Sequence, residues 1–236
     1  MEELLTEGRK CRLFGSGRPA CILVQPSARH ENATLEAEAA QIAALSPVPF
    51  VLAAIQLDDW TLDLMPWWDG NISRDPEAGK HAEKTLQFIL ASLIPMLQER
   101  YGPLPVILGG YSLGGLFALW ASARTDAFQG IAAASPSVWI HGWIPFAKKN
   151  APRARNVYLS LGLQEEHVKN LAIARVGDRI REQIALLQNQ SGPDCCTLVW
   201  EEGNHFTDNA GRLARAFAWC MDPARSMVRI IPTTPE

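Results

Sequence analysis

The sequence predicts an α/β fold with a mostly parallel central sheet and helices on both faces. Short apolar runs alternate with longer amphipathic stretches along the chain, which is typical of βα units. Several of the short runs are continuously apolar, as expected for parallel strands buried on both faces. Of 236 residues, 47% are hydrophobic and 20% charged, a balance that permits a large buried core. Because no repeat or low-complexity linker interrupts the pattern, we expect one domain over residues 1–236.

The expected strands are apolar segments of four to six residues, most of them bounded by glycine or proline. The turn-like sequence Ser16-Gly17-Arg18-Pro19 separates the first two and predicts an antiparallel hairpin at the sheet edge. The remaining segments then supply the parallel part of the sheet. The predicted strands are 11–15, 21–25, 50–55, 106–109, 130–134, 156–161 and 196–201.

The expected helices are the longer stretches in which apolar residues recur at helical spacing. In the second of them Leu86, Ile89, Leu90, Leu93 and Leu97 share one face. The same helix contains Pro95, where we expect a kink. The predicted helices are 33–45, 77–100, 113–124, 168–189 and 207–221.

The strongest local signal is a G-x-S-x-G motif, Gly110-Tyr111-Ser112-Leu113-Gly114. It lies between a predicted buried strand and an apolar helix, which is the context of the nucleophile elbow of the α/β-hydrolase fold. Small residues on both sides of the serine let strand and helix approach closely. The Leu113 N–H, at the helix start, is then the first oxyanion donor. The alternatives are a glycine-rich turn with an incidental serine, or a phosphate loop, whose Lys-Ser/Thr ending is missing.

A serine nucleophile needs a base, and the chain offers five histidines, His30, His81, His141, His167 and His205. His205 alone follows the last predicted strand and precedes the last helix. This matches the chain order serine, acid, histidine of the α/β-hydrolase fold. The alternative is a solvated loop or helix-cap histidine.

The acid that orients the histidine should follow a strand between the serine and the histidine. Glu165 and Glu166 both follow the predicted strand 156–161. We favour Glu165, because the acid in such folds commonly lies three residues after the loop glycine, and Glu166 remains an alternative. Asp178 and Asp194 are interpreted as surface residues.

Four segments together resemble the putative esterase family, which is related to esterase D and the ferric enterobactin esterases. They read GGYSLGG at 109–115, SPSVW at 135–139, YLSLG at 158–162 and GNHF at 203–206. The resemblance implies an α/β-hydrolase fold and cleavage of carboxylic esters without a cofactor, by a triad that falls on Ser112, His205 and Glu165.

Two departures from the family pattern affect the site. The acid is a glutamate where many relatives carry aspartate. After the early strand, Gln25-Pro26-Ser27 stands where a His-Gly motif is common. Since Pro26 has no N–H to donate, we assign the second oxyanion donor to Ser27.

Tryptophans concentrate in the irregular segment after strand 50–55, at Trp60, Trp67 and Trp68. Loops at the carboxyl ends of strands carry the site in open α/β sheets. We therefore expect these side chains, with Trp139, to wall an acyl or aromatic pocket. Core packing under a long loop is the alternative.

Bulk properties exclude several classes of function. A formal net charge of −3 attracts neither nucleic acid nor an anionic membrane. We expect no signal peptide and no membrane span, because the N-terminus lacks a basic and apolar leader and no apolar run is long enough. Five cysteines, with Cys195 and Cys196 adjacent, fit neither a disulfide framework nor a zinc site. The sequence thus predicts a reduced, cytoplasmic protein with a small-molecule ester substrate and no metal or other cofactor.

Some alternatives stay open at this level. A thioesterase, a peptidase or an acyltransferase uses the same triad, and a binding protein can keep the fold without chemistry. A metal-dependent hydrolase is disfavoured, because no spaced histidine–carboxylate cluster occurs in the sequence. The natural ester and the oligomeric state do not follow from the sequence.

Overall fold

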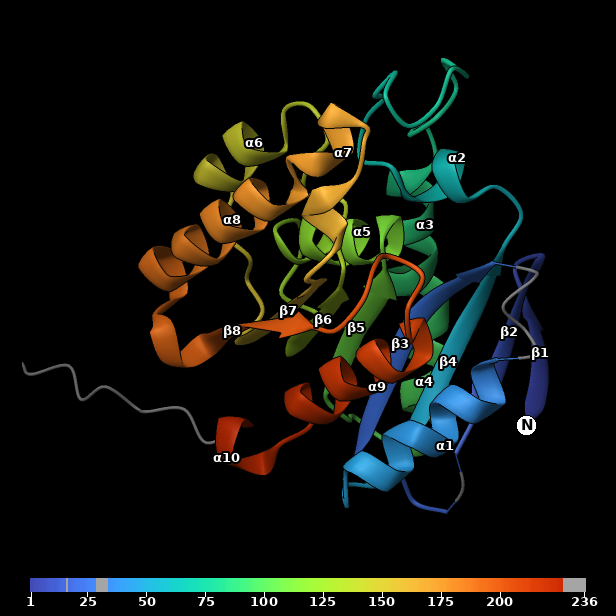
Figure 1. The fold of residues 1–236 in the computed structure, drawn as a ribbon. Coiled ribbons are helices and arrows are strands. Elements are labelled where there is room, and N and C mark those ends of the chain that lie inside the picture. The colour runs from blue at the N-terminus through green and yellow to red at the C-terminus, as the bar shows by residue number, and fades with distance from the viewer. Residues whose placement is uncertain (16, 29–33, 227–236) are drawn as a thin grey trace, which may run out of the picture.

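The computed structural model describes residues 1–15, 17–28 and 34–226. Their strands form an eight-stranded sheet in the order β1-β2-β4-β3-β5-β6-β7-β8 (Figure 1). From β4 to β8 every neighbouring pair is parallel, and β1 and β2 are antiparallel to their neighbours. The mostly parallel sheet is therefore confirmed. The strands are β1 Glu2–Thr6, β2 Arg9–Phe14, β3 Cys21–Ala28, β4 Phe50–Leu57, β5 Val106–Tyr111, β6 Gly130–Ala134, β7 Asn156–Gly162 and β8 Cys196–Glu201.

An antiparallel N-terminal hairpin at the sheet edge is also confirmed, but its strands are not the predicted ones. It consists of β1 and β2, joined at Glu7 and Gly8, which both have positive φ, as tight hairpin turns require. The predicted pairing of 11–15 with 21–25 is wrong, because β4 lies between β2 and β3. β3 is buried along nearly its whole length, so it needs a neighbour on each side and takes a central position.

Helices cover both faces of the sheet, as predicted (Figure 1). One face packs against α1 (Leu35–Leu45) and α9 (Asn209–Cys220), whose apolar side chains join one core cluster. The other face packs against α3 (Ala82–Phe88), α4 (Ile94–Tyr101), α5 (Leu113–Ser122), α6 (Trp143–Lys149) and α8 (Val176–Ser191). The remaining short helices are α2 Trp60–Leu64, α7 Leu171–Ala174 and α10 Pro223–Ser226.

The predicted helix 77–100 begins later and contains a π-helical turn. Residues 77–81 form turns, α3 starts at Ala82, and the π-helical turn Ile89–Leu93 joins α3 to α4. Pro95 lies at the start of α4, directly after this turn. Because proline has no N–H and its ring crowds the carbonyl one turn earlier, a wider turn at this point accommodates it.

The other predicted helices change mainly at their ends. The predicted helix 168–189 is divided into α7 and α8, after a 3₁₀ turn at Glu165–His167. Position 33 of the predicted helix 33–45 lies outside the described residues, and α1 begins at Leu35. The helices α2 and α6 were missed, because each has only five or seven residues and too few turns for a clear period.

The parallel strands place the candidate site residues at one edge of the sheet. Ser112 follows β5, Ser135 follows β6, Glu165 lies three residues after β7, and His205 lies in the loop after β8. Ligand sites of open α/β sheets form at this carboxyl edge. None of the helices in the described ranges is long and apolar enough to cross a membrane.

Candidate active site

Ser112 occupies a sharp turn between β5 and α5. Its backbone has φ 57° and ψ −117°, a conformation that costs free energy for any residue with a side chain. The turn is fixed by two hydrogen bonds, from the Ser112 N–H to the Ala134 carbonyl (3.0 Å) and from the Leu116 N–H to the Ser112 carbonyl (3.0 Å). A Cβ atom on Gly110 would lie 2.4 Å from the Gly114 carbonyl carbon. The motif therefore needs glycine at 110 for steric reasons.

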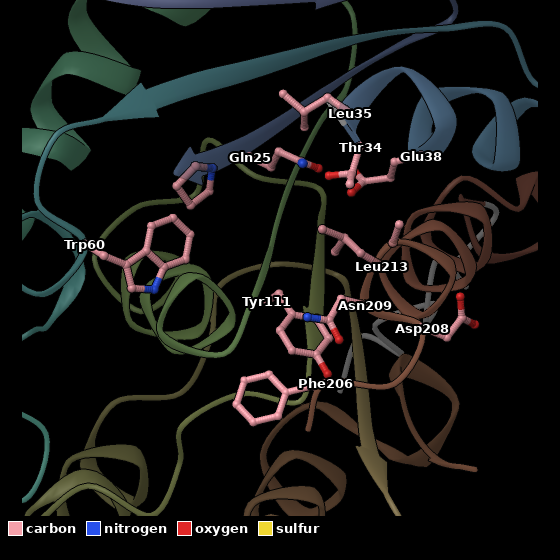
Figure 2. A pocket seen from close by; sticks show the side chains of 12 residues that line it. Gln25, Thr34, Leu35, Glu38, Trp60, Tyr111, Phe206, Asp208, Asn209 and Leu213 are labelled. Carbon is pink, nitrogen blue, oxygen red and sulfur yellow. The ribbon is translucent and has the colours of Figure 1, made fainter. Parts of the chain in front are cut away.

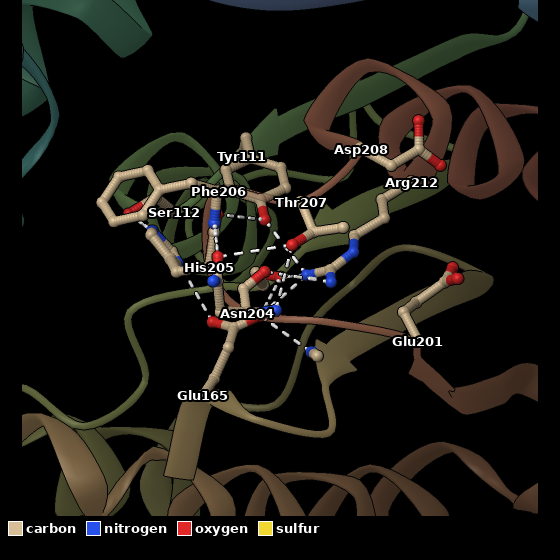
Figure 3. A network of polar contacts seen from close by, with 12 residues as sticks. Tyr111, Ser112, Glu165, Glu201, Asn204, His205, Phe206, Thr207, Asp208 and Arg212 are labelled. Carbon is tan, nitrogen blue, oxygen red and sulfur yellow. Dashed lines mark hydrogen bonds and ion pairs between the residues drawn. The ribbon is translucent and has the colours of Figure 1, made fainter. Parts of the chain in front are cut away.

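Ser112, His205 and Glu165 form one chain of hydrogen bonds (Figure 3). Ser112 Oγ lies 3.1 Å from His205 Nε2, and His205 Nδ1 lies 2.7 Å from Glu165 Oε2. The alternative acid, Glu166, instead makes two 2.8 Å contacts with Arg181 at the surface. The structure thus brings together the three residues that the sequence singled out and places Glu166 elsewhere.

The environment of Glu165 keeps its carboxylate ionised. Burial opposes ionisation, but the hydrogen bond with His205 and the bonds donated by Gly162 and Ser135 outweigh it, so the pKa of Glu165 lies below its ordinary value. Both donors bind Oε1, the Gly162 N–H at 2.7 Å and the Ser135 hydroxyl at 2.8 Å. Oε2 is thereby directed at the imidazole. Ser135 itself has a positive φ of 43°, a second strained backbone beside the site.

Sequence reasoning missed two side chains that hold this arrangement, Arg212 and Tyr111. Arg212, on α9, is fully buried and its Nη1 lies 2.8 Å from Glu165 Oε1. Tyr111 donates its hydroxyl to the His205 carbonyl at 2.8 Å, and burial raises the pKa of this phenol. A signal was available in the sequence, since Arg212 interrupts the apolar face that Leu213, Ala216 and Phe217 extend.

A second serine lies beside Ser112. The hydroxyls of Ser112 and Ser137 are 3.3 Å apart, and the Ser137 N–H donates to the Ser112 carbonyl at 3.1 Å. Ser137 is almost fully buried. The segment 135–139 carried the family resemblance in the sequence, but nothing there marked Ser137 as a neighbour of the elbow.

Of the two residues predicted as oxyanion donors, Leu113 directly follows Ser112 and Ser27 lies in β3. Leu113 is the first residue of α5, so its N–H has no partner within the helix. Ser27 lies near the carboxyl end of β3, and its hydroxyl donates to the Ile55 carbonyl at 3.2 Å. The preceding Pro26 ring would lie 3.2 Å from a Cβ on Gly114. The Pro26 ring of β3 is therefore next to the start of α5, but Ser27 itself is paired with Gln56 of β4, and oxyanion donation by Ser27 stays a prediction.

A cavity of about 370 Å³ opens beside the serine turn (Figure 2). Its aromatic walls are Trp60, Tyr111 and Phe206, two of which flank the site directly in sequence. Phe206 is largely exposed at 85%. The remaining lining residues come from β3, from α1 and its start, and from the start of α9: Gln25, Pro26, Thr34, Leu35, Glu38, Asp208, Asn209, Ala210 and Leu213.

Of the four predicted pocket tryptophans, the structure brings only Trp60 to this cavity. Trp67 donates its Nε1 hydrogen to the His141 carbonyl (2.8 Å) and stacks on Trp143. Trp68 is 52% exposed, and Trp139 packs against the core. Trp67 and Trp139 pack against the same core cluster as Trp60, but neither lines the cavity.

Three of the other histidines have surroundings of their own. The His81 ring lies 3.6 Å from the Asp63 carboxylate. The His141 backbone N–H donates to the Asp69 carboxylate at 2.7 Å. His167 is the last residue of the 3₁₀ turn after β7. His30 falls outside the described residues.

Comparison with known proteins places the chain among esterases. Residues 35–208 match the model of a family described as "Putative esterase". Two similar solved structures are the siderophore hydrolases EstA and EstB from Aspergillus nidulans, with TM-scores of 0.71 and 0.72 and identities of 18% and 19%. The alignment covers 92% of this chain and of EstA, and 94% of this chain and of EstB.

A third similar structure is the enterobactin esterase Fes from Shigella flexneri, with a TM-score of 0.66 and 16% identity. It aligns with 94% of this chain but only 59% of its own. No curated protein matches the sequence. At these identities the solved structures establish the shared fold, which is the α/β-hydrolase fold predicted from the sequence.

Proposed function

Because the chain belongs to the putative esterase family, and is thereby a carboxylic-ester hydrolase, we propose that it works through a Ser112–His205–Glu165 triad and an acyl-enzyme intermediate. The observation that carries the proposal is the continuous hydrogen-bond chain, 3.1 Å from Ser112 Oγ to His205 Nε2 and 2.7 Å from His205 Nδ1 to Glu165 Oε2. Both separations lie within proton-transfer reach. The ionised state of Glu165 at neutral pH gives further support.

In the acylation step, His205 Nε2 accepts the Ser112 proton while Oγ attacks the ester carbonyl carbon. The carbonyl π electrons move to oxygen, and the Leu113 N–H at the start of α5 stabilises the resulting oxyanion. The Ser27 N–H at the end of β3 is the proposed second donor. Glu165 keeps the Nδ1 hydrogen of His205 directed towards itself, so that Nε2 faces the serine, and it stabilises the imidazolium that forms.

The tetrahedral intermediate collapses by breaking the bond to the alcohol oxygen, which takes the proton from His205 Nε2. Water then attacks the acyl-serine, with His205 again accepting a proton, and the acid product leaves as Ser112 recovers its hydrogen. Besides the ester, these steps consume one water molecule. The cavity beside Tyr111 is the proposed place for the substrate, with Trp60 and Phe206 as its apolar walls.

The test is Ser112-dependent chemistry. We expect a fluorophosphonate probe to label the protein and nitrophenyl esters of varied acyl length, with one matching thioester, to be hydrolysed. Ser112→Ala should abolish both. Ser122→Ala is the matched control, because Ser122 lies on the same helix, α5, and its hydroxyl donates to the Leu119 carbonyl at 2.8 Å. Labelling that persists in Ser112→Ala, or wild-type protein that is neither labelled nor active, would refute the proposal.

A further inference from the structure

Arg212 connects the acid to the loop that carries the histidine (Figure 3). Its Nη1 contacts Glu165 Oε1 at 2.8 Å, the Ser135 hydroxyl at 3.1 Å and the Tyr111 hydroxyl at 3.2 Å. Its Nη2 donates to the carbonyls of Glu202 at 2.7 Å and Asn204 at 3.1 Å. One planar guanidinium thus binds the carboxylate on one side and the turn before His205 on the other.

Burial of the Arg212 guanidinium carries a desolvation penalty in the free energy of folding. Arg212 is 0% exposed, and a buried charge lowers stability by several kcal/mol unless it is paired and hydrogen-bonded. Its partner in charge is Glu165, and its other partners are neutral oxygens. A neutral hydrogen-bonding residue could hold the loop with a smaller desolvation penalty. The positive charge of Arg212 is therefore expected to have a role of its own.

The charge balance of the site supplies one. With His205 neutral, Arg212 and Glu165 sum to zero. Without the arginine, a buried carboxylate beside a neutral imidazole leaves one uncompensated negative charge, which protonation of His205 would cancel. A protonated imidazole cannot accept the Ser112 proton. The guanidinium therefore opposes protonation of His205 in the resting enzyme.

We infer that Arg212 is a positioning residue with two roles, and the inference rests on the proposed triad. It holds Glu165 and the 202–205 turn in one rigid unit, and its charge keeps His205 in the neutral form that serves as base. Tyr111 extends the same unit, because its hydroxyl contacts Arg212 and donates to the His205 carbonyl at 2.8 Å.

Of the other charged groups near this loop, Glu202 is exposed to solvent and the rest are paired. Glu201 and Asp208 contact Arg215 at 2.9 Å and 3.0 Å, and Glu166 contacts Arg181 at 2.8 Å. The ionisable groups bonded directly to His205 or to its acid are therefore Glu165, Tyr111 and Arg212. Of these, only Arg212 brings a positive charge.

Two substitutions separate the roles. Arg212→Gln keeps a hydrogen-bond donor but removes the charge, and we expect the acidic limb of the kcat/KM profile to move to higher pH by about one unit. Arg212→Lys keeps the charge but loses the two guanidinium nitrogens that bind Glu165 and the loop carbonyls at once. We therefore expect the acidic limb of the kcat/KM profile to stay in place while kcat falls at least tenfold at all pH values. KM should change little in either variant, since Arg212 is buried behind the acid.

A titration of the His205 ring by NMR, assigned with His205→Asn, provides a readout that does not need turnover. In Arg212→Gln its midpoint should rise in step with the kinetic limb. A folded Arg212→Gln whose limb and midpoint match the wild type would overturn the inference. If circular dichroism shows that variant to be unfolded, the lysine variant decides, and wild-type kcat in Arg212→Lys would then refute the positioning role.

The outcome also distinguishes this inference from the proposed function. Wild-type protein without Ser112-dependent hydrolysis contradicts the function itself. Ser112-dependent hydrolysis with an unmoved acidic limb in Arg212→Gln leaves the function intact and contradicts only the role of Arg212.

Discussion

Replacing Gly110 by alanine tests whether the serine turn depends on close contact between strand and helix. The added Cβ would lie 2.4, 2.6 and 2.8 Å from the carbonyl carbon, carbonyl oxygen and Cα of Gly114. Ordinary contacts of a Cβ begin at 3.4 Å, so β5 and α5 must separate by about 1 Å. All three atoms are backbone, and no side-chain rotation relieves the contact. We expect destabilisation of about 3 kcal/mol or more, the upper end for overpacking.

The same displacement would move Ser112 relative to His205, and a misplacement of about 1 Å costs on the order of 100-fold in rate. Gly114→Ala is the matched control on the other side of the serine. Its Cβ would meet only side-chain atoms, Pro26 at 3.2 Å and Trp60 at 3.5 Å. Alanine in a helix also gains about 0.5–1 kcal/mol over glycine, so we expect stability within about 1 kcal/mol of wild type.

Urea unfolding at a constant m value and the rate of fluorophosphonate labelling measure the two effects. Equal losses of unfolding free energy in Gly110→Ala and Gly114→Ala would refute the steric reasoning. So would wild-type labelling by a folded Gly110→Ala protein, because the turn would then tolerate the added methyl group without moving the nucleophile.

Three further outcomes follow from the site. Glu165→Gln should lower kcat/KM by about 10²–10⁴. Glu166→Gln should keep kcat/KM within about twofold of the wild type, since its partner Arg181 is a surface residue. Steady-state kinetics of both variants decide between the two acids. Trp60→Ala should raise KM for nitrophenyl esters about tenfold through loss of the cavity wall, and Trp68→Ala, half exposed, should leave KM unchanged. Because the pKa of Glu165 is lowered from 4.5 by folding, its stabilisation is complete above that pH and lost as the pH falls through the lower folded value. Urea unfolding between pH 6 and pH 3 should therefore show a steeper loss of stability in wild type than in Glu165→Gln.

The parts of the molecule that the sequence predicted are those governed by local pattern. β6 and β8 have the predicted bounds, since glycine or a polar turn ends each apolar run. The sharp turn at Ser112 was predicted because an elbow needs glycines at fixed spacing, and these are visible in the sequence. His205 followed from chain order, which the parallel topology converts into position at one sheet edge.

The parts that it did not predict depend on distant pairing. The hairpin was assigned to the wrong strands because β1, a short strand with exposed Glu2, Glu3 and Leu5, lacks a clear apolar signal. The turn 16–19 looked like a hairpin connection although β3 enters the centre of the sheet. Trp67 resembled a pocket residue by position, but the aromatic rings that it contacts, Trp143 and Phe146, come from a helix about 80 residues later.

The preference for Glu165 over Glu166 shows how sequence and packing share the definition of the site. Spacing after the loop glycine favoured Glu165, yet the two neighbours differ by only one position and carry the same carboxyl group. In the structure the two glutamates pair with different arginines. Glu165 pairs with a buried arginine on α9, and Glu166 pairs with an exposed arginine on α8. A buried guanidinium lies close enough to hold one carboxylate oxygen and leave the other for the imidazole, while a surface pair leaves its carboxylate in solvent. The placement of the Glu165 carboxylate thus involves Arg212, a residue 47 positions away, and if the proposed triad holds, a variant that moves the arginine should impair Glu165 without altering the sequence around it.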